Sequence, residues 1–308
     1  MLRRALVGLS EQPRLQQLIL AAPGARRAAA RFVAGDTLGE TIPVVRDLNR
    51  RRIRVSLNCL GEKTETREDA IAAARSYAEM LQTIETERLE CNISVKLSQL
   101  GVDNYPQVCD ASIRELLTLA RAKGNFIRID MESAVYVDAT LALYRRLRAE
   151  GFDNIGIVLQ SYLRRTEADL NTLLPLRPRV RLVKGAYAES PAVAYPRKTD
   201  VDANFRRLME RLLDEAVGLA IATHDERIID HARAHARGHR LDPTSFEFQV
   251  IYGVRRDLQT RLVEDGYGMR VYVPFGTRWF PYFMRRLAER PANLGFVLRS
   301  LILERSRF

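Results

Sequence analysis

The sequence predicts a (β/α)₈ barrel, and three observations lead to this fold class. Eight short apolar runs with strand character recur from residue 53 onward. A helix-like pattern follows each of them, and alternating strands and helices indicate a parallel sheet. Eight such units fill about 250 residues, the usual size of this barrel. Since periodicity alone does not show that a sheet closes, a doubly wound open sheet is the alternative.

The elements follow one another in regular order. Residues 1–50 have helical patterns with breaks at 21–24 and 34–37, so we expect an N-terminal helical segment over 1–50 and a barrel domain over 51–308. No low-complexity linker divides the barrel region. The clearest helical patterns lie at 67–85, 137–151 and 201–218. The strand-like runs span residues 52–61, 92–100, 126–132, 154–162, 179–187, 219–225, 246–253 and 269–276.

The composition bounds the partners of the chain. The formal net charge is +11, but only five of the 49 basic residues are lysine, and arginines are spread along the whole chain. No nucleic-acid-binding motif accompanies them, so we expect no nucleic-acid partner. No apolar run reaches the roughly 18 residues that span a bilayer. The arginine-rich N-terminus has apolar stretches too short for a secretory signal, and we interpret it as helical rather than as a transit peptide.

The three cysteines, Cys59, Cys91 and Cys109, form no CxxC pair. Their spacing indicates neither a disulfide framework nor a zinc site. We therefore expect thiols, buried where they lie in or beside strands, in a reducing cytosol.

Polar residues at the ends of the predicted strands point to a ligand site. Ligands of such barrels bind at the C-terminal ends of the strands. Lys96 and Asp130 are out of place in strands that should be apolar, because burying either charge alone costs several kcal/mol. Mutual neutralisation of these two would explain them, but it does not explain the polar ends of the other strands. The set is Glu62, Lys96, Asp130, Gln160, Arg181, Lys184, Thr223, His224, Gln249 and Tyr272.

The last helical pattern, "WFPYFMRRLAER", has two different faces. Tyr282, Arg285, Arg286 and Glu289 share one face, and apolar residues take the other. This face is either solvated or directed into a pocket. In a pocket, two guanidinium groups would match a carboxylate or a phosphate.

The histidines give a weaker signal. All four lie between residues 224 and 239, and His231 and His235 have the i, i+4 spacing of a metal pair. Their helix is otherwise rich in Arg and Ala and lacks an accompanying carboxylate or thiolate, so we expect His231, His235 and His239 to be surface residues and no metal site. His224 differs because it ends a strand. The phosphate-loop, dinucleotide-binding, zinc-protease and serine-hydrolase motifs are absent from the sequence.

Eight motifs in order resemble the proline dehydrogenase family. They are "SVKLSQLG", "RIDME", "IVLQSYLRRT", "RLVKGAY", "ATHDERII", "FEFQVIYGV", "VYVPFG" and "YFMRRLAER". Each motif alone is weak, but the ordered set is specific and covers about residues 5–300. The length resembles the monofunctional bacterial form, without the fused aldehyde dehydrogenase of the bifunctional members.

The resemblance implies a distorted (β/α)₈ barrel that holds FAD, with the final helix over the top of the barrel. It implies oxidation of L-proline to Δ1-pyrroline-5-carboxylate, the first step of proline degradation to glutamate, with electrons passed to a membrane quinone. A separate pyrroline-5-carboxylate/glutamate semialdehyde dehydrogenase would be a transient partner. The protein would be cytoplasmic, or peripheral at the inner face of the cell membrane.

The resemblance also assigns residues. Arg285 and Arg286 match the arginine pair that binds the substrate carboxylate. Lys96, Asp130, Tyr272, Tyr282 and Tyr187 match residues around the substrate, and Ile251 stands where the family mostly has leucine beside the pyrrolidine ring. Asp130 and Arg181 match catalytic positions, with Arg181 contacting the flavin near N5. The further flavin-contact positions are Met131, Gln160, Lys184, Gly185, Ala186, Thr223 and His224.

Three alternatives stay open from the sequence. A flavin barrel enzyme acting on hydroxyproline or on another cyclic amino acid or amine would differ in one or two pocket side chains. Methylenetetrahydrofolate reductase has a similar fold, but it has no reason to present an arginine pair to a small amino acid. A basic barrel without catalytic activity, binding a membrane or a nucleic acid, would hold no flavin and would bind with strong salt dependence.

Overall fold

Eight parallel strands close into a barrel in which each strand pairs with the next one in the sequence and β8 pairs with β1. This computed structural model describes residues 29–61, 63–215 and 218–289, and the side chains of residues 285–289 lie outside that description. Closure decides between the barrel and the open sheet, and the predicted fold class is confirmed. The strands are β1 Arg54–Cys59, β2 Cys91–Val95, β3 Ile127–Ile129, β4 Ile155–Gln160, β5 Arg179–Val183, β6 Leu219–Ala222, β7 Glu247–Ile251 and β8 Gly268–Phe275.

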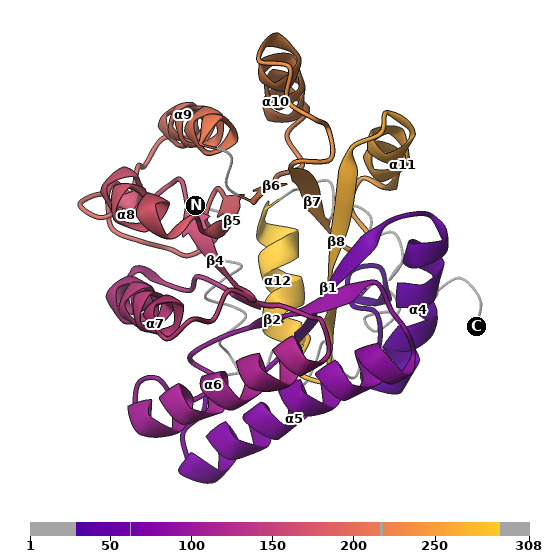
Figure 1. Cartoon of the computed structure of the whole chain (residues 1–308), viewed down its shortest axis with the longest axis vertical. Helices are drawn as coiled ribbons and strands as arrows, with labels where there is room; N and C mark the ends of the chain where they lie inside the picture. The colour runs from indigo at the N-terminus through magenta and orange to yellow at the C-terminus, as the bar shows by residue number, and fades with distance from the viewer. Residues whose placement is uncertain (1–28, 62, 216–217, 290–308) are drawn as a thin grey trace, which may run out of the picture.

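Helices surround this barrel in the order of the sequence (Figure 1). Of the described helices, α4 packs against β1 and β8, whereas α12 lies in the centre of the ring. The helix that follows the last strand is thus not part of the outer layer. The helices are α4 Leu38–Arg50, α5 Arg67–Thr86, α6 Pro106–Ala122, α7 Val137–Ala149, α8 Thr166–Leu173, α9 Lys198–Asp214, α10 Glu226–Gly238, α11 Arg256–Glu264 and α12 Phe280–Glu289.

Local sequence signals explain where α4 and α5 begin. The hydroxyl of Thr37 accepts a hydrogen bond from the backbone N–H of Glu40 at the start of α4. Thr66 and Asp69 form a reciprocal capping box at the start of α5. These contacts satisfy N–H groups that have no partner within the helix. The break predicted at 34–37 therefore lies directly before α4, while the division of the chain at residue 50 stays a prediction.

The strands alternate between two environments. Val55, Leu57, Ile93 and Val95 are fully buried apolar residues of β1 and β2. The residues between them, such as Ser56 and Ser94, are polar and make hydrogen bonds across the barrel. Apolar side chains therefore face the helices, and polar ones fill the barrel interior. We expected nearly continuous apolar strands, so the polar interior is a departure from the sequence interpretation.

A second apolar cluster seats α12 on the barrel. Phe283 and Met284 of α12 are buried against a group that includes Phe32 and Leu60. Leu60 directly follows β1, so α12 lies at the C-terminal ends of the strands. The apolar face predicted for this helix is thus its packing face, as expected.

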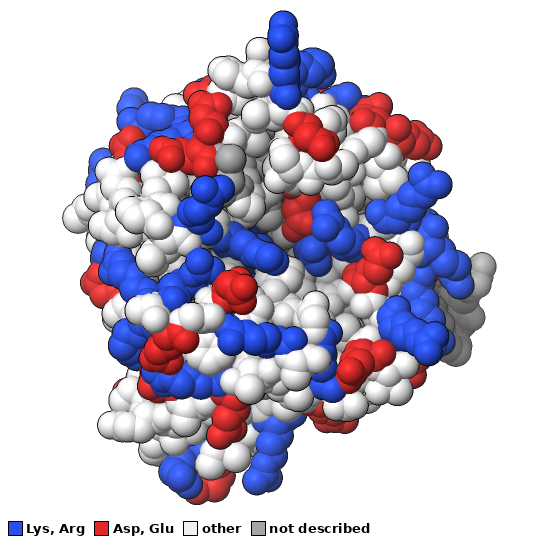
Figure 2. Space-filling view, viewed as in Figure 1, with Lys and Arg blue, Asp and Glu red and all other residues white. Residues whose placement is uncertain are grey.

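The surface in Figure 2 carries basic and acidic residues side by side over the outer helices. Arginines of this surface pair with nearby carboxylates, for example Arg114 with Glu150. The pattern agrees with the interpretation that the arginines are spread over the surface. Cys59, Cys91 and Cys109 are free thiols, and the last two are buried.

Candidate active site

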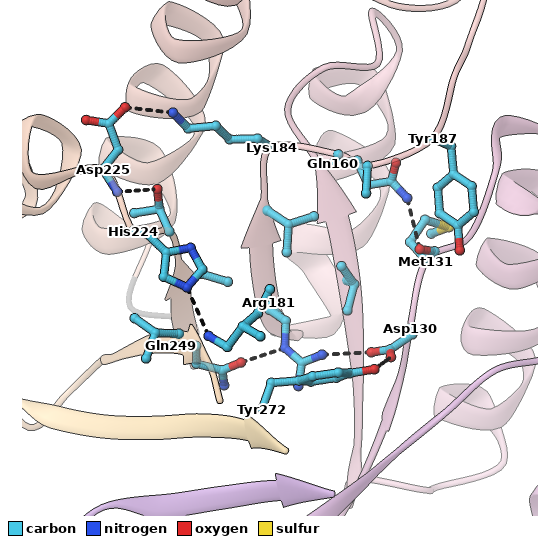
Figure 3. Close-up of a pocket in the computed structure, with 18 of the residues that line it drawn as sticks. Asp130, Met131, Gln160, Arg181, Lys184, Tyr187, His224, Asp225, Gln249 and Tyr272 are labelled. Carbon is cyan, nitrogen blue, oxygen red and sulfur yellow. Dashed lines mark hydrogen bonds and ion pairs between the residues drawn. The ribbon is translucent and has the colours of Figure 1, made fainter. Parts of the chain in front are cut away.

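A cavity of about 800 Å³ opens at the C-terminal ends of the strands (Figure 3). Every residue assigned to substrate, cofactor or catalysis from the sequence lines this cavity, wherever the structure describes its side chain. The cavity therefore brings together residues of α12 and of seven strands, β2 to β8, or of the loops that directly follow these strands. Those residues are Lys96, Asp130, Met131, Gln160, Arg181, Lys184, Gly185, Ala186, Tyr187, Thr223, His224, Ile251, Tyr272 and Tyr282.

Arg181, Asp130 and Tyr272 form a closed group on the floor of the cavity (Figure 3). Arg181 Nη1 donates to Asp130 Oδ1 at 2.7 Å, and the Tyr272 hydroxyl donates to Asp130 Oδ2 at 2.8 Å. The guanidinium carbon of Arg181 lies 5.2 Å from the centre of the Tyr272 ring. Burial, followed by the nearby Asp130, raises the pKa of Tyr272 well above its usual value. The phenol therefore stays protonated and keeps donating to the carboxylate.

The other two guanidinium nitrogens of Arg181 donate to side chains inside the barrel. Its Nε donates to Gln249 Oε1 at 2.6 Å, and its Nη2 donates to the hydroxyls of Ser56 and Ser94 at 3.2 and 3.1 Å. A guanidinium with contacts on all three nitrogens has little rotational freedom. Its positive charge is thus fixed at one place beside the cavity.

A deeper ion pair supports Gln249. Gln249 Nε2 donates to Glu247, and Arg270 Nε donates to the same carboxylate at 2.8 Å. Arg54 forms a further ion pair with Glu247 at 3.0 Å. Burial alone would raise the pKa of Glu247, but Arg270 and then Arg54 outweigh it and lower the pKa to about 2. A hydrogen-bonded chain therefore runs from Asp130 through Arg181 and Gln249 to the lower barrel.

Sequence reasoning missed Glu247, Arg270 and Arg54. Each lies two residues from a polar residue on the inner face of the same strand: Gln249, Tyr272 and Ser56 respectively. This spacing of two along a strand is the signal that would have found them.

Lys96 lies near the same group, from the end of β2. Its ammonium donates to Asn58 Oδ1 at 3.2 Å. Asp130 forms its ion pair with Arg181. Asp130 is thus neutralised from β5, which is not the Lys96–Asp130 pairing that we considered from the sequence.

Gln160 presents one polar atom without a partner among the described residues. Its Nε2 donates to the carbonyls of Met131 and Glu132 at 3.0 and 2.7 Å. Its Oε1 is buried and accepts no hydrogen bond. A buried acceptor left open costs about 1–3 kcal/mol unless a bound molecule supplies a donor. Gln160 is therefore a cavity residue with one position ready for a ligand N–H.

Gly185 carries the backbone closely over an aromatic ring. Its φ is +112°, and a Cβ placed there would lie 2.1 Å from the Tyr162 ring. The Tyr162 N–H donates to the Lys184 carbonyl at 2.8 Å and fixes the loop there. Only glycine accommodates both the left-handed backbone and this contact.

The upper rim of the cavity is charged. Lys184 pairs with Asp202 at 2.6 Å and with Asp225 at 2.8 Å. Lys198, Arg227 and Arg255 also line the cavity there, beside the start of α10. His224 Nε2 accepts the N–H of Ile251 at 3.0 Å, which fixes its ring toward β7. Of these rim residues, Asp202, Lys198 and Arg255 lie outside the eight family motifs.

The substrate side that we expected is only partly described. Tyr282 of α12, Ile251 at the end of β7 and Tyr187 line the cavity, and Figure 3 labels Tyr187 among its lining residues. Since Tyr282 faces the cavity, its helix directs the predicted polar face toward it at that position. The side chains of Arg285, Arg286 and Glu289, and residue Glu62, lie outside the described residues.

The chain is similar to known proteins over nearly its full length. The family model described as "Proline dehydrogenase" matches residues 41–299. Proline dehydrogenase 1 of Bacillus subtilis subsp. natto is 39% identical over 302 residues, which are 98% of this chain and 99% of that protein. Proline dehydrogenase of Deinococcus radiodurans is also 39% identical, over 97% of both chains.

Solved structures share the fold. Proline utilization A from Bdellovibrio bacteriovorus, inactivated by N-propargylglycine, superposes with a TM-score of 0.81 at 25% identity. The match covers 86% of this chain and 33% of that longer chain. The family expected from eight ordered motifs is therefore confirmed, and this chain belongs to the proline dehydrogenase family.

Proposed function

We propose that this chain oxidises L-proline to Δ1-pyrroline-5-carboxylate, with FAD as its cofactor and a membrane quinone as the electron acceptor. This reaction would be the first step of proline degradation to glutamate. One observation carries the proposal. The described residues that the family assigns to substrate and flavin all line the same cavity, around the fixed Arg181 guanidinium.

The cavity residues fit a flavin nucleotide. The Oε1 acceptor of Gln160, which has no partner among the described residues, suits a ring N–H. Gly185 has no side chain, so its own backbone can lie close against the Tyr162 ring at the cavity. Lys198, Arg227 and Arg255 stand beside the start of α10, where exposed backbone N–H groups favour phosphate. When bound, FAD supplies the two-electron acceptor for the hydride of the substrate.

The residues of the chain bind and orient the substrate. Proline is a zwitterion, and we propose that Arg285 and Arg286 bind its carboxylate with their planar donor groups. Asp130, Lys96 and Tyr272 would then surround the rest of the molecule at the ends of their strands. The ammonium would first lose one proton to solvent, hydride would then leave the ring carbon beside the nitrogen, and release of the remaining N–H proton to solvent would give the neutral imine product. Holding that carbon in place supplies much of the rate.

The Arg181 side chain contributes electrostatics. Its guanidinium is fixed by Asp130, Gln249 and the two serine hydroxyls before any substrate arrives. We propose that this charge stabilises the negative charge that the reduced cofactor acquires. A preorganised charge of this kind needs no rearrangement during the reaction.

The acceptor and the partner are also part of the proposal. No helix among the described residues has the length and hydropathy needed to cross a bilayer. We propose that the chain works in the cytoplasm and reaches the quinone from the inner face of the cell membrane. The product would pass to a separate pyrroline-5-carboxylate/glutamate semialdehyde dehydrogenase.

An anaerobic visible spectrum tests the proposal. The purified full-length chain is supplied with FAD, freed of excess cofactor, and titrated with L-proline, with hydroxyproline as a parallel substrate. We expect a flavin spectrum that bleaches with L-proline. A flavin spectrum that only hydroxyproline or another cyclic amine bleaches would replace the substrate and keep the cofactor. A chain that retains no flavin would contradict the enzymatic proposal as a whole.

A further inference from the structure

The ends of α9 and α10 bring histidines and a carboxylate together away from the cavity. The two helices pack side by side, and their last residues are Asp214 and Gly238. The sequence analysis set the histidines of α10 aside, because the carboxylates of their own helix, Glu226 and Asp230, are not one helical turn from His231 or His235. The carboxylates come instead from the preceding helix, α9.

Three side chains form a compact ligand set. His235 Nε2 lies 2.7 Å from Asp214 Oδ1. The His239 ring stacks on the His235 ring with 4.0 Å between centroids. One ligand atom from each of Asp214, His235 and His239 lies within 4.8 Å of the other two. An ion between them replaces the proton that His235 Nε2 shares with Asp214 Oδ1, and the side chains need to move only slightly because Zn–N and Zn–O bonds are roughly 2.0–2.2 Å long.

The tautomer of His239 suits a metal ligand. Its Nδ1 lies 2.9 Å from the backbone carbonyl of His235, so this nitrogen carries the proton and donates. The lone pair is then on Nε2. A histidine that ligates a metal commonly donates its other ring N–H to a carbonyl in this way, which fixes the ring.

The surroundings favour a cation that arrives from solvent. The carbonyl ends of both helices lie here, and each carries a partial negative charge. The side chain of His235 is only 12% exposed, so its neighbours restrict its movement. The side chain of Asp214 is 48% exposed, so an ion can reach it from solvent. Two imidazoles with one carboxylate suit zinc and similar ions. Calcium and magnesium prefer sites made of oxygen atoms.

We propose that Asp214, His235 and His239 bind a divalent transition-metal ion of the zinc class and tie the end of α9 to the end of α10. Three protein ligands leave the fourth tetrahedral position to water. The opposite ends of the same two helices carry Lys198 and Glu226, which line the cavity. The metal would therefore stabilise the helix pair that supports the cavity rim without contacting the cavity.

The structure offers a matched control one turn earlier. His231 Nε2 contacts Glu210 Oε1, so the same two helices carry a second histidine–carboxylate pair. Neither residue belongs to the ligand set of Asp214, His235 and His239. Substitution of His231 thus removes an equivalent histidine–carboxylate contact between the same two helices but leaves the three proposed ligands in place.

Calorimetric titration of Zn²⁺ into the untagged, FAD-supplied full chain, after dialysis against a chelator, tests the site. We expect one equivalent of Zn²⁺ to bind and the Tm to rise with the Zn²⁺ concentration, as mass action requires. His235→Ala, His239→Ala and Asp214→Asn should each weaken binding by more than the roughly 10–100-fold that loss of an outer contact costs. His231→Ala should bind as the unsubstituted chain does.

Three results would overturn the site. They are no binding of Zn²⁺, undiminished binding by the three ligand variants, and an equal loss in His231→Ala. Because Asp214 and His239 are exposed, their variants keep the test valid even if His235→Ala folds poorly. The result does not depend on the proposed oxidation of proline, since the readouts are heat and Tm.

Discussion

Arg181 and Asp130, which are 51 positions apart, form a buried ion pair of 2.7 Å that joins β5 to the end of β3. Tyr272 donates to the second oxygen of Asp130 and places its ring near the same guanidinium. The charge of Arg181 is thus matched by one carboxylate and held at the cavity floor.

Arg181→Ala should slow flavin reduction by about 10²–10³-fold, the typical cost of removing one preorganised electrostatic group. The apparent affinity for L-proline should change much less, because we propose that the guanidinium acts on the cofactor and not on the substrate. Anaerobic stopped-flow rates over a range of L-proline concentrations separate the two effects. Arg179→Ala is the control, since Arg179 lies two residues earlier in β5 and is exposed. Equal reduction rates in Arg181→Ala and the unsubstituted chain would remove the proposed role.

Tyr272→Phe and Asp130→Asn should interact in a double-mutant cycle. The phenol–carboxylate hydrogen bond involves a charged acceptor, so a coupling of about 1.5–3 kcal/mol is expected in the free energy of activation from kcat/KM. The ring near Arg181 stays in Tyr272→Phe, which isolates the hydroxyl. Strictly additive effects would mean that the two residues do not act through this contact.

Gly185→Ala should lower both the FAD content and the Tm. The substitution forces a Cβ into the Tyr162 ring and strains a backbone of positive φ. Gly151→Ala separates the two causes, because Gly151 also has a positive φ (+85°) but open space around it. The control should cost about 1 kcal/mol of stability from backbone strain and keep its FAD. Equal FAD content in both variants would show that the close approach at 185 is not needed for the cofactor.

Arg285→Met and Arg286→Met should raise the KM for L-proline sharply and leave the FAD content unchanged. The reason is the loss of a guanidinium that we propose pairs with the substrate carboxylate. Steady-state kinetics measures the KM, and a flavin spectrum measures the FAD content. Arg278→Met, at an exposed arginine just before α12, is the matched control. An unchanged KM in both variants would mean that Arg285 and Arg286 do not bind the substrate and belong to a solvated helix face.

The sequence predicted the barrel because strand and helix periodicities alternate over its whole length. It also predicted residues that line one cavity, because the C-terminal ends of parallel strands must meet at one end of a barrel. Thr223 and Tyr272 are 49 positions apart in the sequence but line one cavity for this reason. The closed pairing of β8 with β1 could not be predicted, since closure is a long-range property.

The partners of the charged groups could not be predicted either. Asp130 pairs across the barrel with Arg181, and the histidines of α10 face Glu210 and Asp214 of α9. Both arrangements depend on how neighbouring elements are rotated, which a single sequence does not specify. The carboxylates that contact His231 and His235 therefore could not be expected from the sequence of α10 alone.

Glu247→Gln should change how the stability of the protein depends on pH. The arginines around Glu247 hold its pKa at about 2 in the folded chain, below its ordinary value of 4.5. A lowered pKa stabilises the fold above the unfolded value and loses that effect as the pH falls toward the folded value. The stability advantage of the unsubstituted chain over the Glu247→Gln variant should therefore be constant above about pH 4.5 and shrink by about 3 kcal/mol toward pH 2.

Urea unfolding of both chains at several pH values between 2 and 7 measures this difference directly. Glu226→Gln is the control, because Glu226 also pairs with two arginines, Arg255 and Arg261, but at the surface. Solvent screens such exposed pairs, so its difference from the unsubstituted chain should vary little with pH. A Glu247→Gln difference that is flat from pH 2 to 7 would mean that the buried carboxylate is not held ionised by Arg270 and Arg54. The contacts from Arg181 through Gln249 would then end at a neutral Glu247 instead of an ionised one.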